Sequence, residues 1–192
     1  MRRFGSGSPQ RQVVASRAER VCQLAQATGF LGRCVIFGSF VTTKPEPNDV
    51  DVFLLMEDDF DFAQLTGEVR LLFEHASAQA HFGASVFWLR RMAAFLGEQA
   101  TLEHWQVKRD GGRMRYCGDC PGGIMIANDQ ELNVTLERIA RFQAQAAHLR
   151  KVENNPANFH AAVSGFLAEI DRMQLAVREY LSSHPAELAA TV

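Results

Sequence analysis

The sequence predicts an α/β (α+β) domain followed by a two-helix antiparallel hairpin. Short apolar runs rich in β-forming residues alternate with segments of helical period in the first half of the chain. Two long amphipathic stripes, joined by Asn154-Asn155-Pro156, follow from residue 128 onward. With 47% hydrophobic and 22% charged residues, the chain of 192 residues is predicted to fold around a globular core.

The first elements are predicted as a tail, a helix and two strands. Residues 1–11 are small, polar or basic and are expected to form a flexible tail. Apolar residues recur at helical spacing over residues 14–28, before a glycine that is typical of a helix end. Residues 34–37 and 50–56 are apolar runs that predict buried strands. The first domain is therefore expected over residues 12–110.

The later elements follow from the same patterns. One apolar face over residues 62–76 predicts a helix, and residues 84–89 predict a third strand. A helix is expected over residues 93–107. After a linker at residues 111–127, the helical hairpin is expected over residues 128–184, and residues 185–192 form a second tail.

Composition excludes several classes of function. Lys+Arg and Asp+Glu nearly balance at 20 against 22, which argues against a long nucleic-acid partner. No apolar run reaches the roughly 18 to 20 residues that cross a bilayer, and the N-terminus lacks the apolar stretch of a secretory signal. A cytoplasmic protein without membrane contact is expected. The four cysteines show no disulfide spacing, so free thiols are expected.

The segment that indicates chemistry lies between the first two predicted strands. Gly38-Ser39 ends the first strand, nine residues follow, and Asp49 and Asp51 then flank the start of the second strand. Strand residues separated by one point to the same side, so the two carboxylates can share hard divalent cations such as Mg²⁺. Gly38 would let the backbone approach a phosphate, to which the Ser39 amide and hydroxyl can donate, and Lys44 could neutralise phosphate charge.

This arrangement resembles the Gly-Ser, spacer, Asp-x-Asp pattern of DNA polymerase beta-like nucleotidyltransferases, here a small bacterial nucleotidyltransferase-domain protein. The resemblance implies a mixed sheet, Mg²⁺ or Mn²⁺ held by Asp49 and Asp51, and a nucleoside triphosphate (NTP) as substrate. It implies transfer of a nucleoside monophosphate to a protein or small-molecule hydroxyl, in the manner of toxin–antitoxin systems. The hairpin loosely resembles antitoxin-type regulators, which implies a protein partner or self-association.

One expected residue is missing from this pattern. Catalytic members of the family usually carry a third acid on the next strand, whereas residues 84–89 contain none. Glu57 or Glu74 could substitute for it. The alternative is a catalytically degenerate module that binds nucleotide or acts as an antitoxin or oligomerisation device.

Other residues have both a functional and a structural interpretation. Arg90 and Arg91 could neutralise phosphate charge or could be solvated surface residues. Trp88 and Trp105 could stack on a base, although large aromatic side chains more often fill a core. The Cys117-Gly-Asp-Cys120 segment lacks the second ligand pair that a zinc site needs.

Residues 111–124 fit neither neighbouring pattern. They carry no helical or strand period, and one choice of codons lets a shifted frame read as a β-strand, with Met125 as a possible start codon for the hairpin. Two hypotheses follow: a natural linker, or a join of two overlapping reading frames.

Overall fold

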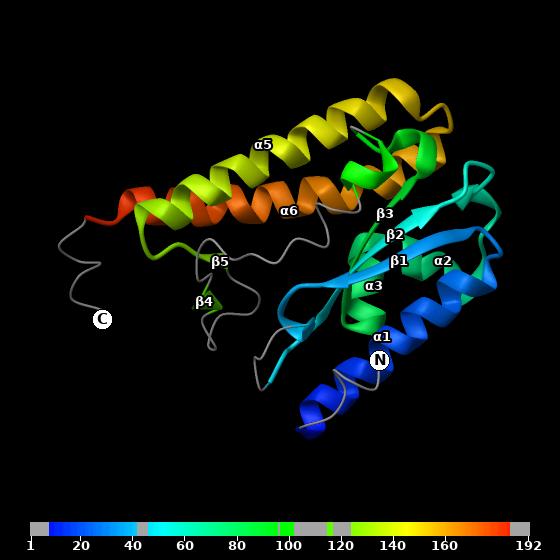
Figure 1. Cartoon of the computed structure of the whole chain (residues 1–192), viewed down its shortest axis with the longest axis horizontal. Coiled ribbons are helices and arrows are strands. Elements are labelled where there is room, and N and C mark those ends of the chain that lie inside the picture. The colour runs from blue at the N-terminus through cyan, green and yellow to red at the C-terminus, as the bar shows by residue number, and fades with distance from the viewer. Residues whose placement is uncertain (1–7, 42–45, 96, 102–114, 117–123, 185–192) are drawn as a thin grey trace. The chain divides into compact units, whose positions relative to one another are not determined.

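The computed structural model describes residues 8–41, 46–95, 97–101, 115–116 and 124–184 (Figure 1). The chain divides into two compact units, one formed by Met1–Val107 with Ala147–Gly165 and the other by Lys108–Ala146 with Phe166–Val192. Strands and helices both contribute, so the predicted α+β class is confirmed.

A three-stranded mixed sheet forms the centre of the first unit. Strands β1 (Leu31–Phe37), β2 (Val50–Met56) and β3 (Ala84–Arg90) lie in the order β1-β2-β3. Strand β1 is antiparallel to β2, and β3 is parallel to it. Strand β1 begins three residues before its predicted start because Leu31 pairs with Met56, an interaction that local sequence does not reveal.

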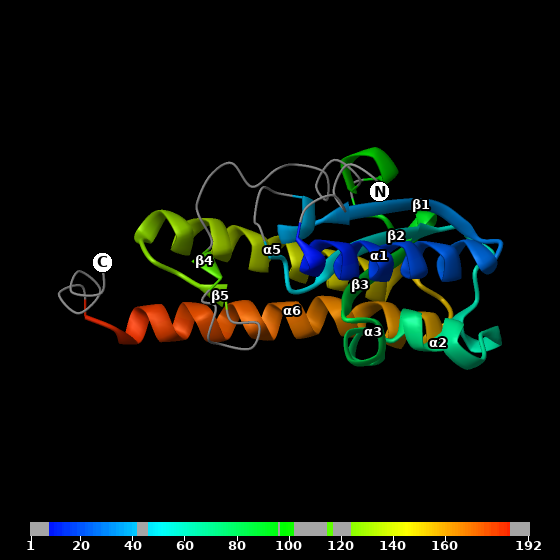
Figure 2. The same cartoon turned by 90° about the horizontal axis from the view of Figure 1, so that it is seen from below.

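Helix α1 (Pro9–Ala27) packs on this sheet, and both views show it running beside the strands (Figure 1, Figure 2). It begins inside the segment predicted as a tail, so that prediction is wrong for residues 9–11. Ser8 caps the helix by accepting a bond of 3.3 Å from the Arg11 amide, and proline suits the first turn. The helix ends before Gly29, whose φ of 76° stops it as predicted.

The segment predicted as one helix over residues 62–76 is divided. A 3₁₀ turn, η2 (Phe62–Gln64), precedes helices α2 (Gly67–Phe73) and α3 (His75–Phe82). The two helices separate at Glu74, which has extended backbone angles of φ −100° and ψ 111°. Its carboxylate accepts a bond of 3.0 Å from the Ser77 hydroxyl, which occupies the first turn of α3.

Aromatic side chains fill the core between the sheet and α2. Trp88 is 2% exposed, its ring nitrogen donates to the Phe73 carbonyl at 3.0 Å, and Phe60 packs edge-on against its ring. Trp88 is therefore a core residue and not a base-stacking surface. Trp105 lies outside the described residues.

The helix predicted over residues 93–107 is seen in part. A 3₁₀ turn, η3 (Arg91–Ala93), follows β3, residues 98–101 are helical, and the rest of the predicted range lies outside the described residues.

Two long helices form the C-terminal hairpin, α5 (Asp129–Val152) and α6 (Pro156–Ser182). Their bounds confirm the predicted connector around Asn155. The connector and the start of α6 belong to the first unit, where Asn158 is fully buried. Its side chain donates to the Phe60 carbonyl at 2.9 Å and accepts from the Phe62 amide at 2.7 Å.

In the second unit the remaining parts of α5 and α6 pack antiparallel. Tyr180 donates to Asp129 at 2.8 Å, and Phe142 packs edge-on against Phe166. Two short strands, β4 (Arg115–Tyr116) and β5 (Ile124–Met125), pair antiparallel within the predicted linker. None of the described helices has the length and apolar character needed to cross a membrane.

Candidate functional site

The central strand of the sheet carries the predicted carboxylates at its start. Asp49 directly precedes β2, and Asp51 is the second residue of the strand. Asp51 is in register with Phe37 of β1 and with Ser85 of β3. Both carboxylate residues are half-buried, so the sheet supports them while leaving part of each accessible.

Gly38 and Asp51 lie in direct contact. Gly38 has a φ of 74°, a region that side chains rarely adopt, and a Cβ atom there would lie 2.8 Å from the Asp51 carboxyl carbon. Only glycine therefore lets the backbone approach the carboxylate. Ser39 follows, half-buried, at the start of the 3₁₀ turn η1 (Ser39–Val41). Lys44 lies outside the described residues.

Helix α1 holds both ends of the segment between β1 and β2. The Arg11 guanidinium donates to the Phe40 carbonyl at 2.7 Å and lies over the Phe40 ring, 5.6 Å from its centroid. The Gln10 amide donates to the Pro47 carbonyl at 3.3 Å. Both residues lie in the segment predicted as a tail, so their role was not predicted. The available signal was Ser8, a good N-cap directly before a proline.

Arg17 of α1 stands at the starts of β2 and β3. Its guanidinium donates to the Asn48 carbonyl at 3.5 Å, next to Asp49. A Cβ atom on Gly83, which directly precedes β3, would lie 2.7 Å from a guanidinium nitrogen of Arg17. The structure thus places a cation beside the backbone that leads into the candidate site, and no local sequence pattern predicts this position.

The residue opposite Asp51 on β3 has a neutral side chain. Ser85, opposite Asp51, is 7% exposed and accepts a bond of 3.2 Å from the Gln79 amide. Among the described residues, no group of three or more His, Cys, Asp or Glu side chains could hold a metal ion. Two carboxylates, Asp49 and Asp51, are therefore the acidic groups that the described part of the site offers.

Glu57, one of the two acids that could substitute, does not stand beside Asp51. Glu57 follows the far end of β2, six residues from Asp51, or about 20 Å along the strand. It pairs with Arg91 at 3.0 Å. Glu74 pairs with Arg70 at 3.2 Å, between α2 and α3.

Arg90 and Arg91 lie at the opposite end of the sheet from the carboxylates. Arg90 is in register with Met56 and donates to Glu153 at 2.6 Å, with the two side chains only 13% and 2% exposed. Arg91 pairs with Glu57 at 3.0 Å and with Glu98 at 3.6 Å. Their interactions are structural, and both arginines are too far along the strand to contact a phosphate at Asp51.

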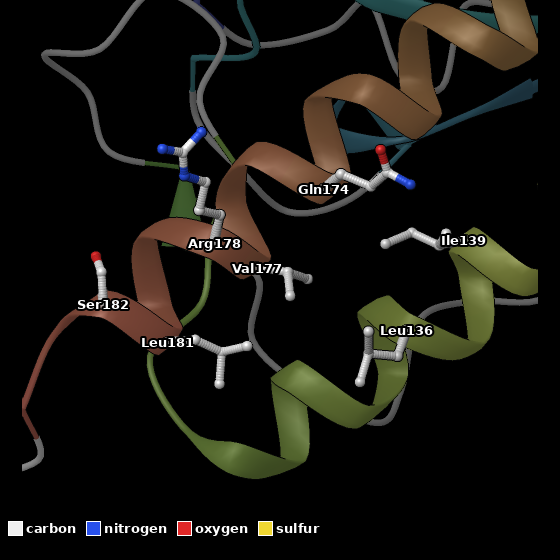
Figure 3. A pocket seen from close by; sticks show the side chains of 7 residues that line it. All are labelled: Leu136, Ile139, Gln174, Val177, Arg178, Leu181 and Ser182. Atoms are coloured by element: carbon white, nitrogen blue, oxygen red, sulfur yellow. The ribbon is translucent and has the colours of Figure 1, made fainter.

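The second unit contains an open groove between α5 and α6 (Figure 3). Leu136 and Ile139 extend from α5 toward Val177 and Leu181 of α6. The groove has an apolar floor and no acidic lining residue, so its chemistry differs from that of the carboxylate site.

Fold and site together define an α+β protein whose central strand starts at two carboxylates, Asp49 and Asp51, the second of which lies against a glycine turn. A family model described as "Family of unknown function (DUF6932)" matches residues 1–125, and the chain belongs to this family. The match covers the three-stranded sheet β1-β2-β3 and ends before helices α5 and α6. No curated protein and no solved structure matches the chain.

Proposed function

We propose that the protein is a nucleotidyltransferase that moves a nucleoside monophosphate from an NTP to a hydroxyl of a protein or small molecule. The contact between Gly38 and the Asp51 carboxylate carries this proposal. The left-handed backbone and the missing Cβ of Gly38 let the Asp51 carboxylate lie directly against the glycine turn. That combination suits a triphosphate whose charge must be neutralised at close range.

A divalent cation fits the donor set of this site. Asp49 and Asp51 supply hard carboxylate oxygens, and Mg²⁺ usually takes one or two carboxylates while keeping waters and substrate phosphates as its other ligands. When bound, the ion would neutralise charge that develops on the triphosphate. Mn²⁺ has the same preference for oxygen ligands.

The surrounding residues would bind and orient the nucleotide. The backbone at Gly38 and the amide and hydroxyl of Ser39 are donors that can face a phosphate. Arg17 adds a positive charge beside Asn48. In the proposed reaction an acceptor hydroxyl attacks the α-phosphorus, the bond to the β-phosphate oxygen breaks, and pyrophosphate leaves.

Transfer of label from an α-labelled NTP, with Mg²⁺ and a cell extract as the source of acceptor, tests the proposal. We expect wild-type protein to label an acceptor and Asp51→Asn to lose at least tenfold of this activity. Asp59→Asn is the matched control because Asp59 is an exposed acid beyond the far end of β2. Equal labelling by wild type and Asp51→Asn would reject the proposal.

A second candidate function is nucleotide binding without turnover. The neutral Ser85 opposite Asp51 favours it, because no third carboxylate there can accept the proton of an attacking hydroxyl. Titration of a fluorescent NTP with Mn²⁺ separates the two candidates. Binding that Asp51→Asn abolishes, together with no label transfer by the wild type, would establish the binding module.

We also propose that the helical hairpin associates with a protein partner, as in toxin–antitoxin-type systems, or with a second copy of the chain. Leu136 and Leu181 at the groove are 44% and 65% exposed, which supports an apolar contact surface. Sedimentation velocity of wild type and Leu181→Glu would test self-association. A monomeric wild type over the micromolar range would exclude the second copy.

A further inference from the structure

Two cysteines face each other where α1 meets β1. The Cys22 and Cys34 sulfur atoms lie 2.9 Å apart, share a hydrogen bond and are both free thiols. Each side chain is half-buried, so each remains partly accessible to a small polar reagent.

We propose that Cys22 and Cys34 form an oxidation site that takes a peroxide as its substrate and ends as an intramolecular disulfide. The inference does not depend on nucleotidyl transfer.

Fully buried neighbours on the helix and on the sheet hold the two thiols in place. On α1, Val21 and Ala25 flank Cys22 and are fully buried, and on the neighbouring strand Leu54, the register partner of Cys34, is fully buried as well. A disulfide places its sulfur atoms about 2.0 Å apart. The two sulfur atoms therefore need to approach by less than about 1 Å, a distance that small side-chain rotations can supply.

The two thiols are chemically unequal. The hydrogen bond from Cys34 lowers the pKa of the Cys22 thiol, and burial and Glu19 oppose this effect only in part. The same hydrogen bond and burial raise the pKa of the Cys34 thiol. Because the thiolate is the reactive form, Cys22 is the attacking residue and Cys34 the resolving one.

The chemistry balances with one hydrogen peroxide for each disulfide. The Cys22 thiolate attacks one peroxide oxygen, the O–O bond breaks, and the products are a sulfenic acid on Cys22 and hydroxide. The Cys34 sulfur then attacks the Cys22 sulfur, the S–O bond breaks, and water leaves with the Cys34 proton. The proton that Cys22 gave up neutralises the hydroxide, so two thiols and one peroxide give a disulfide and two waters.

The position of the pair links oxidation to the candidate site. Cys34 lies in strand β1, which ends at Phe37, directly before Gly38. Helix α1 supplies Arg11 to the segment that follows. The disulfide would bind the helix covalently to the strand whose end forms the glycine turn.

Peptide mapping of the full chain tests the inference. The protein is treated with stoichiometric hydrogen peroxide, alkylated and digested with trypsin without reduction. Trypsin cleaves after Arg33, the one basic residue between the two cysteines, so their peptides stay joined only through a disulfide. We expect the linked pair, and its loss on reduction. Separate alkylated peptides, or a disulfide confined to Cys117 and Cys120, would overturn the inference.

Two variants test the order of events. Both carry serine in place of Cys117 and Cys120, and each lacks one cysteine of the pair in addition. We expect Cys34→Ser to accumulate a sulfenic acid on Cys22 that a dimedone probe labels. Cys22→Ser should give at least fivefold less labelling of Cys34 at the same dose. Equal labelling of the two variants would overturn the assigned roles. Circular dichroism checks that both fold, and the wild-type mapping tests the disulfide without either variant.

Discussion

Replacing Gly38 by alanine should destabilise the protein through two separate effects. The backbone there has a φ of 74°, and a non-glycine residue in this region pays about 1–2 kcal/mol. The new Cβ would also lie 2.8 Å from the Asp51 carboxyl carbon, well inside van der Waals contact. Overpacking of this kind costs about a further 1–3 kcal/mol. We expect a total loss of about 2–5 kcal/mol in the free energy of unfolding.

Gly29→Ala is the matched control. Gly29 has a φ of 76°, almost that of Gly38, but a Cβ there meets no atom within 4 Å. It should therefore lose only the backbone contribution of about 1–2 kcal/mol. Urea unfolding followed by circular dichroism gives both values from their midpoints and slopes.

A double-mutant cycle assigns the difference to the carboxylate. In the Asp51→Ala background the carboxylate is gone and only the Cβ of residue 51 remains, 3.2 Å from the new Cβ. The Gly38→Ala substitution should then lose little more than the backbone contribution, which gives a coupling of about 1–3 kcal/mol between the two positions. Equal destabilisation by Gly38→Ala and Gly29→Ala, or a coupling near zero, would refute the contact on which the candidate site depends.

Three further predictions concern polar contacts of the first unit. Arg11→Met should cost about 1–3 kcal/mol because it leaves a buried carbonyl without its donor, whereas Arg20→Met removes a half-exposed ion pair and should cost less than about 1 kcal/mol by the same urea assay. Arg90→Met should cost about 3–5 kcal/mol because Glu153, only 2% exposed, loses its counter-charge; a loss below that of Arg20→Met would contradict this. The backbone amide of Ala63 lowers the pKa of the Asp61 carboxyl most, and the side-chain amides of Gln64 and Asn155 lower it further. The ionised Asp61 carboxylate therefore adds to the free energy of unfolding above the ordinary carboxyl pKa near 4, and this stabilisation is lost as pH falls through the lowered pKa. Asp61→Asn should therefore weaken the dependence of stability on pH below about pH 4.

The sequence predicted correctly those elements whose ends are marked by the residues directly beside them. Strand β2 has its predicted bounds, Val50–Met56, because an apolar run between a proline-rich segment and charged residues is unambiguous. The break at Glu74 was not predicted, since apolar residues keep helical spacing on both sides of it. Periodicity records which side chains face the core and does not record a change in backbone direction between two short helices.

The same limit applies to the candidate site. Gly38 and Asp51 were singled out because they belong to one Gly-Ser, spacer, Asp-x-Asp pattern between two adjacent strands, whereas their direct contact was not predicted. Arg11 was not, because its role depends on the packing of α1 against a loop 29 residues away. From sequence, Arg90 could be a phosphate ligand or a solvated surface residue, and the pairing with Glu153, 63 residues away, identifies it as structural.

The contacts of the hairpin connector also bear on the origin of residues 111–124. Asn158 and Glu153 lie beyond the family match, yet both are buried against residues within it. The Asn158 side chain pairs with the Phe60 carbonyl and with the Phe62 amide. A buried polar group destabilises the fold unless it has a hydrogen-bond partner of this kind. Such matching is expected of segments selected together, which favours a natural linker over a join of unrelated reading frames. The nucleotide sequence of the gene decides between them, because codons that forbid an open shifted frame across residues 115–121 would exclude the join.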